Sequence, residues 1–238
     1  MPGSPNCDPR VSAAMGAREL VSSLNPSLIG VGTSTTVAKF IDLALESGLF
    51  AGRDLVASSI DTMARLRSLG LRLLDPSSVE SIDVYVDGAD EVDGRGWAVK
   101  GRGGALLGEK VIAFSSRVNI FIVSEEKLVE RLGSTTPVPI EVLPFSLSMV
   151  LRSLHRRGFR AEPRRSGGKA GPVVSDWGGV IVDVYTGPMD DPESVERELS
   201  SIPGVVETGL FIGYADYVIV GRRDCTWEAL SFGRKARG

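Results

Sequence analysis

Apolar residues along the first half of the chain alternate between two patterns. Short apolar runs that suit buried strands are followed by segments whose apolar residues recur every three or four positions, as on one face of a helix. The expected strands cover residues 28–31, 55–59, 71–74, 84–86 and 119–123, and the expected helices cover 10–24, 37–48, 61–69 and 108–114. This alternation predicts an α/β fold with a Rossmann-like parallel sheet and helices on both faces.

Residues 124–127 are a capping sequence and are expected to open another helix. The order of elements changes after residue 133. Extended segments at 137–142, 159–163, 173–175, 180–184 and 205–210 are interspersed with helical ones at 147–154 and 191–199. This order predicts a smaller α+β domain of the ferredoxin-like, split βαβ type. An apolar strand at 217–220 is expected to return to the first domain. We therefore expect a Rossmann-like catalytic domain of residues 1–135 and 211–238, and a small domain of residues 136–210.

Composition narrows the class of protein. The chain has 238 residues and a net charge of −3, which gives no general attraction to nucleic acid or to an acidic membrane surface. No apolar run approaches the roughly 20 residues that span a bilayer. Cys7 and Cys225 lie near opposite ends and form no disulfide framework, which suits the reducing cytosol and predicts a cytoplasmic protein.

Two basic features have ordinary explanations. The single histidine, His155, lies in a basic helical segment, so a histidine-rich metal site is excluded and acid–base chemistry falls to carboxylates and lysines. A local basic cluster consists of Arg152, Arg156, Arg157, Arg164, Arg165 and Lys169. No aromatic residues are interspersed as a stacking surface, so we expect a solvated face rather than a nucleic-acid site.

The strand at 28–31 is followed by Gly32-Thr33-Ser34-Thr35-Thr36 and then by a helix. Free N–H groups at a helix N-terminus favour phosphate, and the hydroxyls add donors. The loop lacks the Gly-Lys-Ser/Thr of a Walker A loop and the third glycine of a dinucleotide-binding fingerprint. It therefore predicts a phosphate site, with a threonine-rich helix cap that binds nothing as the alternative.

The stretch from 83 to 110 concentrates titratable residues against glycines. Asp87 and Asp90 follow a strand, Lys100 precedes Gly101 and Gly103, and Glu109 opens a helix. Beside a phosphate site, this set suits proton transfer on a phosphorylated sugar, in which one base moves a proton between adjacent carbons. We expect Glu109 to be that base if burial raises its pKa, Lys100 and the loop amides to stabilise the enediolate, and both aspartates to bind hydroxyls and assist ring opening.

Several segments together resemble the type A ribose-5-phosphate isomerase family. They are Gly30-Val-Gly-Thr-Ser-Thr-Thr36, Tyr85-Val-Asp-Gly-Ala-Asp-Glu91, Lys100-Gly-Arg-Gly-Gly-Ala-Leu-Leu-Gly-Glu-Lys110, Pro137-Val-Pro-Ile-Glu-Val142 and Ile202-Pro-Gly-Val-Val-Glu-Thr-Gly-Leu-Phe211. The resemblance implies interconversion of ribose 5-phosphate and ribulose 5-phosphate through an enediolate, without a metal or organic cofactor. It also implies the pentose phosphate pathway and a homodimer or homotetramer.

The resemblance assigns roles to individual residues. It implies that Glu109, Asp87 and Lys100 are catalytic, and that substrate is bound by Thr33, Ser34, Thr35, Thr36, Asp87, Gly88, Ala89, Asp90, Lys100, Gly101, Arg102, Gly103 and Lys127. The family usually has glycine at the positions of Ser34 and Arg102, where a backbone with φ > 0 would be costly for these residues. A family lysine in the first helix has no clear counterpart, and Arg10 or Arg18 is the expected substitute.

Individually, these residues also have simpler explanations. Asp87 and Asp90 are common turn formers, Lys100 could be a solvated loop residue and Glu109 an ordinary charge at a helix start. Two other functions stay open. The domain could sense a sugar phosphate without turnover, although no helix-turn-helix extension is present. A nicotinamide-dependent oxidoreductase is disfavoured by the missing dinucleotide fingerprint.

Overall fold

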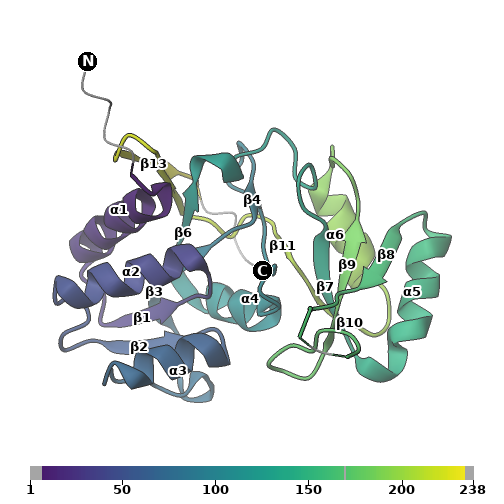
Figure 1. The fold of residues 1–238 in the computed structure, drawn as a ribbon, viewed down its shortest axis with the longest axis horizontal. Coiled ribbons are helices and arrows are strands. Elements are labelled where there is room, and N and C mark those ends of the chain that lie inside the picture. Colours follow the sequence, from purple (N-terminus) through teal and green to yellow (C-terminus); the bar gives the residue numbers. More distant parts are fainter. Residues whose placement is uncertain (1–6, 169, 234–238) are drawn as a thin grey trace.

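The computed structural model describes residues 7–168 and 170–233 of the chain. Among them, six strands form the main sheet in the order β13-β12-β6-β3-β1-β2 (Figure 1). These strands are β1 (Leu28–Val31), β2 (Asp54–Ala57), β3 (Ile82–Gly88), β6 (Ser116–Ser124), β12 (Tyr217–Gly221) and β13 (Trp227–Ser231). The first five in chain order pair in parallel, and β13 pairs antiparallel with β12 at the edge.

The strand order places a crevice beside β1. The strand pairs with β2 on one side and with β3 on the other. The chain thus leaves β1 in one direction across the sheet and later continues in the opposite direction from β3 to β6. Ligands of open parallel sheets bind at such a reversal, outside the carboxyl ends of the strands. The loop after β1 and the end of β3 therefore meet at the edge where a ligand is expected.

Alternation along the strands gives the main sheet two apolar faces. Val84 and Val86 of β3 pack into a core with α1 (Pro9–Leu24), α2 (Thr35–Glu46) and α3 (Ile60–Ser68). Tyr85 points to the other face, because successive strand residues alternate sides. That face is covered by α4 (Leu106–Phe114) and by a three-stranded sheet of β4 (Glu91–Val92), β5 (Ala98–Val99) and β11 (Leu210–Phe211). The predicted α/β fold with helices on both faces is confirmed.

The second sheet belongs to a smaller unit with the predicted βαββαβ order. Its strands are β7 (Val138–Val142), β8 (Arg160–Pro163), β9 (Val180–Tyr185) and β10 (Val205–Thr208), and its helices are α5 (Leu147–Arg156) and α6 (Pro192–Ser200). All its pairings are antiparallel, in the order β10-β7-β9-β8, as in a ferredoxin-like sheet. Val150 and Leu154 of α5 are buried against this sheet. We propose the domain boundaries near residues 135 and 211, where the chain passes between the two sheets.

A buried carboxylate holds one of these crossings. Glu91 is fully buried, and its oxygens accept hydrogen bonds from the Gly133 amide at 2.6 Å, the Thr136 amide at 2.9 Å and the Thr135 hydroxyl at 2.6 Å. The Thr135 amide also donates to it. A buried carboxylate is tolerated only when it is well hydrogen-bonded, so this crossing is fixed rather than loose.

Some local predictions were wrong. The expected strand at 71–74 is reduced to one bridge between Leu73 and Leu55, and that at 173–175 to one between Val174 and Val180. The expected helix after residue 124 is a single 3-10 turn, η2 (Glu125–Lys127), and Ser124 makes no side-chain cap. Strands β4, β5 and β13 were not predicted, since two-residue strands show no periodicity and β13 is mostly exposed.

The two cysteines contradict the expectation from the sequence. Cys7 and Cys225 form a disulfide across 218 positions, with their Cα atoms 5.1 Å apart. The Cys7 amide also donates to the Arg223 carbonyl at 2.9 Å, which ties the segment before α1 to the β12–β13 hairpin. Disulfides occur in oxidising compartments and in intracellular proteins of hyperthermophiles, so the cysteines give no support for a reducing compartment. Across the described residues, no helix has the length and apolar character needed to cross a membrane.

Candidate active site

A cavity of about 640 Å³ lies at the carboxyl ends of β1 and β3, and all of its lining residues belong to the first domain. Every predicted site residue except Asp87 lines it: Thr33, Ser34, Thr35, Thr36, Gly88, Ala89, Asp90, Lys100, Gly101, Arg102, Gly103, Glu109 and Lys127. Asp87 is fully buried directly beneath them. Four separate stretches of sequence therefore converge on one site, as strand ends in a parallel sheet allow.

Asp87 lies near the carboxyl end of β3, and hydrogen bonds hold both oxygens of its carboxylate. Its Oδ1 atom accepts hydrogen bonds from the Thr33 amide at 3.0 Å and the Gly88 amide at 2.7 Å. Its Oδ2 atom accepts from the Tyr85 hydroxyl at 2.5 Å and the Lys100 ammonium at 2.7 Å. Burial and the Asp87 charge raise the pKa of Tyr85 well above its usual value, so the phenol stays protonated and remains a donor.

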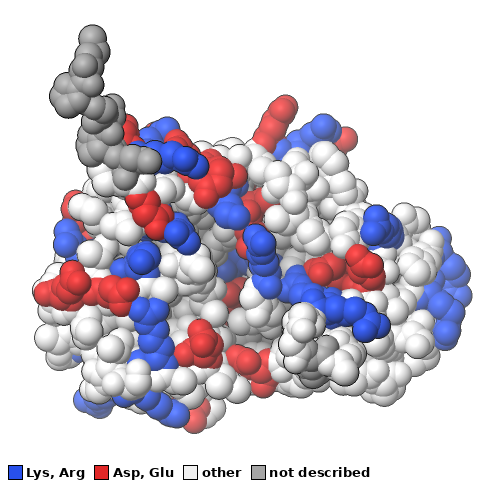
Figure 2. Space-filling view, in the orientation of Figure 1, with Lys and Arg blue, Asp and Glu red and all other residues white. Residues whose placement is uncertain are grey.

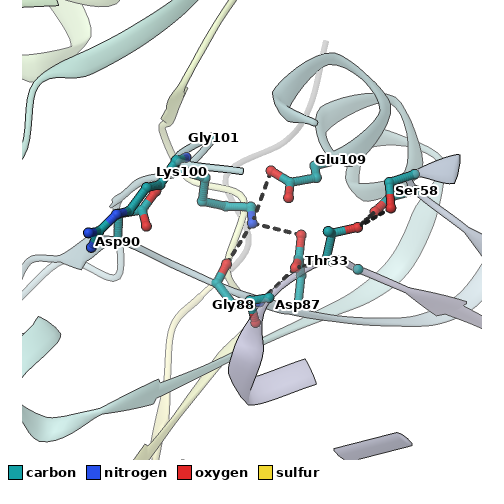
Figure 3. Close-up of polar contacts among 12 residues, drawn as sticks. Thr33, Ser58, Asp87, Gly88, Asp90, Lys100, Gly101 and Glu109 are labelled. Carbon is teal, nitrogen blue, oxygen red and sulfur yellow. Dashed lines mark hydrogen bonds and ion pairs between the residues drawn. The ribbon is translucent and has the colours of Figure 1, made fainter. Parts of the chain in front are cut away.

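Lys100 reaches the same point from the loop after β5 (Figure 3). Its ammonium group donates to Asp87 at 2.7 Å and to the Gly88 carbonyl at 2.6 Å, and it lies 3.3 Å from Oε2 of Glu109. Burial lowers the pKa of Lys100, but the charges of Asp87 and Glu109 act against it and the net direction is upward. Lys100 therefore places a fixed positive charge at the cavity wall.

Glu109 lies in the first turn of α4 and is 2% exposed. Burial is the main cause that raises its pKa to about 8; Lys100 opposes the shift, while Asp87 adds to it. The Oε2 atom contacts Lys100 but makes no hydrogen bond with proper geometry in the described structure. A carboxylate with raised pKa and a free oxygen at a cavity is well suited to accept and return a proton.

Asp90 differs from Asp87 although both follow β3. It accepts a hydrogen bond from the Arg102 amide at 3.0 Å. Burial raises its pKa, and that hydrogen bond only partly offsets the effect. Asp90 is therefore the carboxyl group of the pair that can exchange a proton with a ligand, whereas Asp87 has both oxygens committed.

Thr33 connects the loop after β1 to the residues that follow β2. Its hydroxyl donates to Ser59 at 2.5 Å and lies 3.0 Å from the Thr62 hydroxyl, which itself donates to the Gly32 carbonyl at 2.8 Å. Ser58 lies at the edge of this group, 3.4 Å from Thr33. Ser58, Ser59 and Thr62 were not singled out from the sequence, although two serines directly after an expected strand were a usable signal.

The loop after β1 ends at the N-terminus of α2. Ser34 is the N-cap: its hydroxyl accepts a hydrogen bond from the Val37 amide at 3.0 Å. Its φ of −167° is ordinary extended backbone. Thr35 and Thr36 form the first turn and line the cavity, so the helix end faces the space where an anion would bind.

The two positions where the family has glycine carry no backbone strain. Neither Ser34 nor Arg102 has a positive φ; in this loop Gly101 and Gly104 do, at +99° and +81°. Gly32 is needed for a different reason, because a Cβ atom there would come within 2.0 Å of the Asp87 carboxylate. The expected cost at Ser34 and Arg102 is therefore absent.

The basic residues are arranged differently from expectation. Arg10 pairs with Asp8 at 2.8 Å and Arg18 with Glu19 at 3.4 Å, and neither lines the cavity. The cavity cations are Arg65, Lys100, Arg102 and Lys127. Arg65, from α3, was not predicted; it is held by Asp42 at 2.6 Å. The prediction that Arg10 or Arg18 supplies a cation to the phosphate site was therefore wrong.

The expected basic cluster is also not one surface. Figure 2 shows acidic and basic side chains mixed over most of this face of the molecule, with a group of basic side chains at the right-hand edge, where Figure 1 places α5. Arg164 is 16% exposed and pairs with Asp183 at 2.5 Å, so it does not belong to a solvated face. Lys169 lies outside the described residues.

Comparisons with known proteins agree with this chemistry. Residues 54–225 match the family model described as ribose 5-phosphate isomerase A (phosphoriboisomerase A). The chain is 51% identical over 227 residues to "Ribose-5-phosphate isomerase A" of Aeropyrum pernix, covering 94% of this chain and 95% of that protein. It is 39% identical over 207 residues to the protein of the same name from Korarchaeum cryptofilum, covering 87% and 91%.

Solved structures give the same result. A D-ribose-5-phosphate isomerase in complex with phospho-erythronic acid superposes with a TM-score of 0.87 at 37% identity, covering 94% of this chain and 97% of that one. Ribose 5-phosphate isomerase A from Methanocaldococcus jannaschii superposes with a TM-score of 0.86 at 31% identity, covering 94% and 98%.

Proposed function

Because the chain belongs to the ribose 5-phosphate isomerase A family and so interconverts ribose 5-phosphate and ribulose 5-phosphate, we propose that Glu109 is its proton-transfer base. One observation carries the assignment: a buried carboxylate with a pKa of about 8 lies 3.3 Å from a buried ammonium group at the cavity wall. A base needs this raised pKa, and the oxyanion formed by proton removal needs a neighbouring positive charge.

The reaction then follows from these two groups. In the open-chain aldose, Glu109 removes the proton on C2, and the electron pair forms the C1–C2 double bond of an enediolate. The charge that develops on the C1 oxygen is stabilised by Lys100, which Asp87 keeps protonated and oriented through the 2.7 Å contact. Glu109 returns the proton to C1, and the C2 hydroxyl proton moves to the C1 oxygen, which yields the ketose. Asp87 acts through Lys100 rather than on substrate.

Ring opening requires a second acid–base group. Asp90 lines the cavity and burial raises its pKa. Among the described residues, its carboxyl group accepts one hydrogen bond, from the Arg102 amide. A carboxyl group of this kind can exchange a proton with the ring oxygen or the C1 hydroxyl. We assign ring opening to Asp90, with Gly88, Ala89 and the 101–103 loop lining the sugar.

The phosphate end of the substrate fits the N-terminus of α2. Thr33 to Thr36 surround that helix end, and Lys127, Arg102 and Arg65 supply positive charge around the same cavity. Helix N-terminal amides and nearby cations together favour a dianion. The solved relative with phospho-erythronic acid binds a phosphorylated acid, and its planar carboxylate has the shape of an enediolate. We expect this acid to compete with ribose 5-phosphate here.

The test is proton NMR of ribose 5-phosphate with the purified protein in heavy water, without added metal. We expect ribulose 5-phosphate to appear with deuterium at the carbon next to the carbonyl, because the enediolate route lets the Glu109 proton exchange with solvent. Glu109→Gln should lower turnover by about 10²- to 10⁴-fold, the usual contribution of a general base, while binding of the phosphorylated acid is retained.

One outcome would contradict the assignment: near-normal turnover by Glu109→Gln would remove Glu109 as the base. Conversion without any solvent deuterium in the product of the parent enzyme would keep the isomerase activity and indicate a shielded proton or hydride transfer. Glu126→Gln is a suitable control, because Glu126 is an exposed glutamate outside the cavity lining.

The family belongs to the pentose phosphate pathway, and we propose that this member works in the cytoplasm, where phosphorylated sugars are retained. We also propose a homodimer or homotetramer. A groove on the small domain is lined by the exposed apolar side chains of Leu143, Phe145 and Met149, and apolar grooves of this kind commonly mark subunit contacts. Light scattering after size-exclusion chromatography measures the oligomeric state directly.

A further inference from the structure

Arg164 extends from the small domain to the 101–103 loop, which lines the catalytic cavity. It directly follows β8, and its backbone is held by a hydrogen bond from its amide to the Ile181 carbonyl at 2.8 Å. The side chain is only 16% exposed. Its neighbour Arg165 is exposed, so two adjacent arginines in the chain have different environments.

The guanidinium group of Arg164 joins two partners. Its Nε and Nη2 atoms donate to the two oxygens of Asp183 at 2.9 and 2.5 Å. Its Nη1 atom donates to two consecutive main-chain carbonyls, those of Gly101 and Arg102, each at 2.8 Å. Only arginine has enough donors in a fixed planar fork to make all four contacts.

These contacts orient a peptide plane beside the substrate. In a trans peptide the N–H and C=O groups point in opposite directions, and the described residues contain no cis peptide. The Arg102 carbonyl points to Arg164, which does not line the cavity, whereas Gly103 does. The Gly103 N–H is therefore directed away from Arg164, and it has no hydrogen-bond acceptor among the described residues.

Other contacts fix the rest of the loop. The Lys100 amide donates to the Gly209 carbonyl at 2.9 Å, the Gly104 amide to the Gly101 carbonyl at 2.9 Å, and the Arg102 amide to Asp90 at 3.0 Å. Among the described residues, Arg164 makes the one hydrogen bond to the peptide plane between Arg102 and Gly103. Its orientation thus depends on a side chain of the other domain.

We propose that Arg164, oriented by Asp183, is a positioning residue that holds the 101–103 loop so that the Gly103 amide donates to the developing enediolate oxygen. This inference rests on the proposed enediolate mechanism at Glu109 and Lys100. It gives the small domain a part in catalysis through the loop that Arg164 holds. Amides held in advance toward a developing oxyanion are among the strongest contributions to catalysis, since no reorganisation is needed during the reaction.

The test compares Arg164→Met with Arg165→Met, which removes the same charge one position along the chain at an exposed site. For Arg164→Met we expect kcat to fall about 10²-fold, the effect of losing one oxyanion donor. KM should change less than about threefold, because the phosphate site on α2 is untouched. The rising limb of the pH–rate profile should keep its midpoint, since Glu109 and Lys100 are not altered. Arg165→Met should match the parent enzyme.

A second variant separates positioning from folding. Arg164→Met leaves Asp183 partly buried without its partner, which is destabilising in itself. The double variant Arg164→Met/Asp183→Leu removes that unpaired charge, so its melting temperature should recover toward the parent value while kcat stays low. Arg164→Lys keeps a charge near Asp183 but cannot bridge both carbonyls, and it should give an intermediate kcat.

The outcomes distinguish this inference from the mechanism on which it rests. If the parent enzyme isomerises ribose 5-phosphate and the folded Arg164→Met variant keeps a near-normal kcat, the positioning role alone is overturned. Recovery of kcat together with melting temperature in the double variant would also overturn it, because the loss would then be structural. Failure of the parent enzyme to form an enediolate in heavy water would overturn both.

Discussion

The ammonium nitrogen of Lys100 lies 3.3 Å from Oε2 of Glu109, and both side chains are at most 3% exposed. An ion pair in water would lower the pKa of the carboxyl group. Here burial outweighs the pairing and raises the pKa of Glu109 to about 8. The contact thus combines a moderately strong base with a permanent positive charge within the same few ångströms.

The activity is expected to depend on pH through Glu109. Since the base must be ionised, kcat/KM should rise with pH, by about tenfold per unit well below the pKa, and level off above pH 8 to 9. Lys100 keeps its charge over this range because its pKa is raised. The substrate phosphate titrates near pH 6, so rates are best compared between pH 7 and 10. A profile that is flat over this interval would contradict the raised pKa.

The free energy of unfolding should fall as pH rises, whereas kcat/KM should rise. The folded protein keeps a proton on Glu109 up to about pH 8, whereas the unfolded chain releases it near 4.5. The folded state therefore binds more protons between these values, and this group lowers the free energy of unfolding by up to about 1.4 kcal/mol per pH unit as pH rises through that range.

Glu109→Gln removes this dependence. We expect the variant to melt within a degree or two of the parent at pH 5 and several degrees higher at pH 9, as measured by calorimetry at both pH values. Glu126→Gln, at an exposed site, provides the control. Equal melting temperatures of Glu109→Gln and parent at pH 9 would show that the carboxylate is not costly when ionised.

Ser34 is expected to matter for stability more than for turnover. Its hydroxyl caps α2 through the Val37 amide, so Ser34→Ala should lower the free energy of unfolding by about 1 kcal/mol and Ser34→Gly by only a few tenths. Because the cap rather than substrate holds this hydroxyl, kcat/KM should stay within about twofold. Urea unfolding and initial rates measure both. A tenfold rise in KM for Ser34→Ala would instead place the hydroxyl on the phosphate.

The disulfide between Cys7 and Cys225 should stabilise the fold without affecting catalysis. In the chain-entropy model, a crosslink over 218 positions contributes about 5 kcal/mol to the free energy of unfolding. Reductant should therefore lower the melting temperature of the parent and leave kcat at moderate temperature unchanged, since neither cysteine lines the cavity. The Cys7→Ser/Cys225→Ser variant should melt at the reduced value and ignore reductant. A parent protein whose melting is indifferent to reductant would exclude a stabilising bridge.

The sequence is informative where the signal is local. Asp87 and Glu109 were predicted because carboxylates after a strand and at a helix start can be read from neighbouring residues, and the structure places them around Lys100. Strand and helix periodicity likewise predicted both sheets. The two-residue strands β4 and β5 are too short for any periodic signal, so the third sheet could not be foreseen.

Contacts between residues that lie far apart in the chain could not be predicted from the sequence. Arg164 lies 62 and 63 positions from the carbonyls that it holds, and an arginine among other arginines indicates a solvated surface. The Cys7–Cys225 disulfide spans almost the whole chain, and the residues near either cysteine give no signal that predicts it. The concern about Ser34 and Arg102 had a related cause: which loop residue adopts a positive φ depends on its hydrogen-bond partners, and here Gly101 and Gly104 take that conformation.

Glu91 ends the same segment that supplies Asp87 and Asp90, yet its carboxylate accepts four hydrogen bonds from residues 133–136. One five-residue segment therefore determines both the charge of the catalytic cavity and the path by which the chain enters the second domain. In this enzyme the same segment therefore contributes both to the reaction chemistry and to the orientation of the two domains. A substitution at Glu91 would therefore lower activity by displacing the small domain and, through Arg164, the 101–103 loop, although no catalytic side chain is changed.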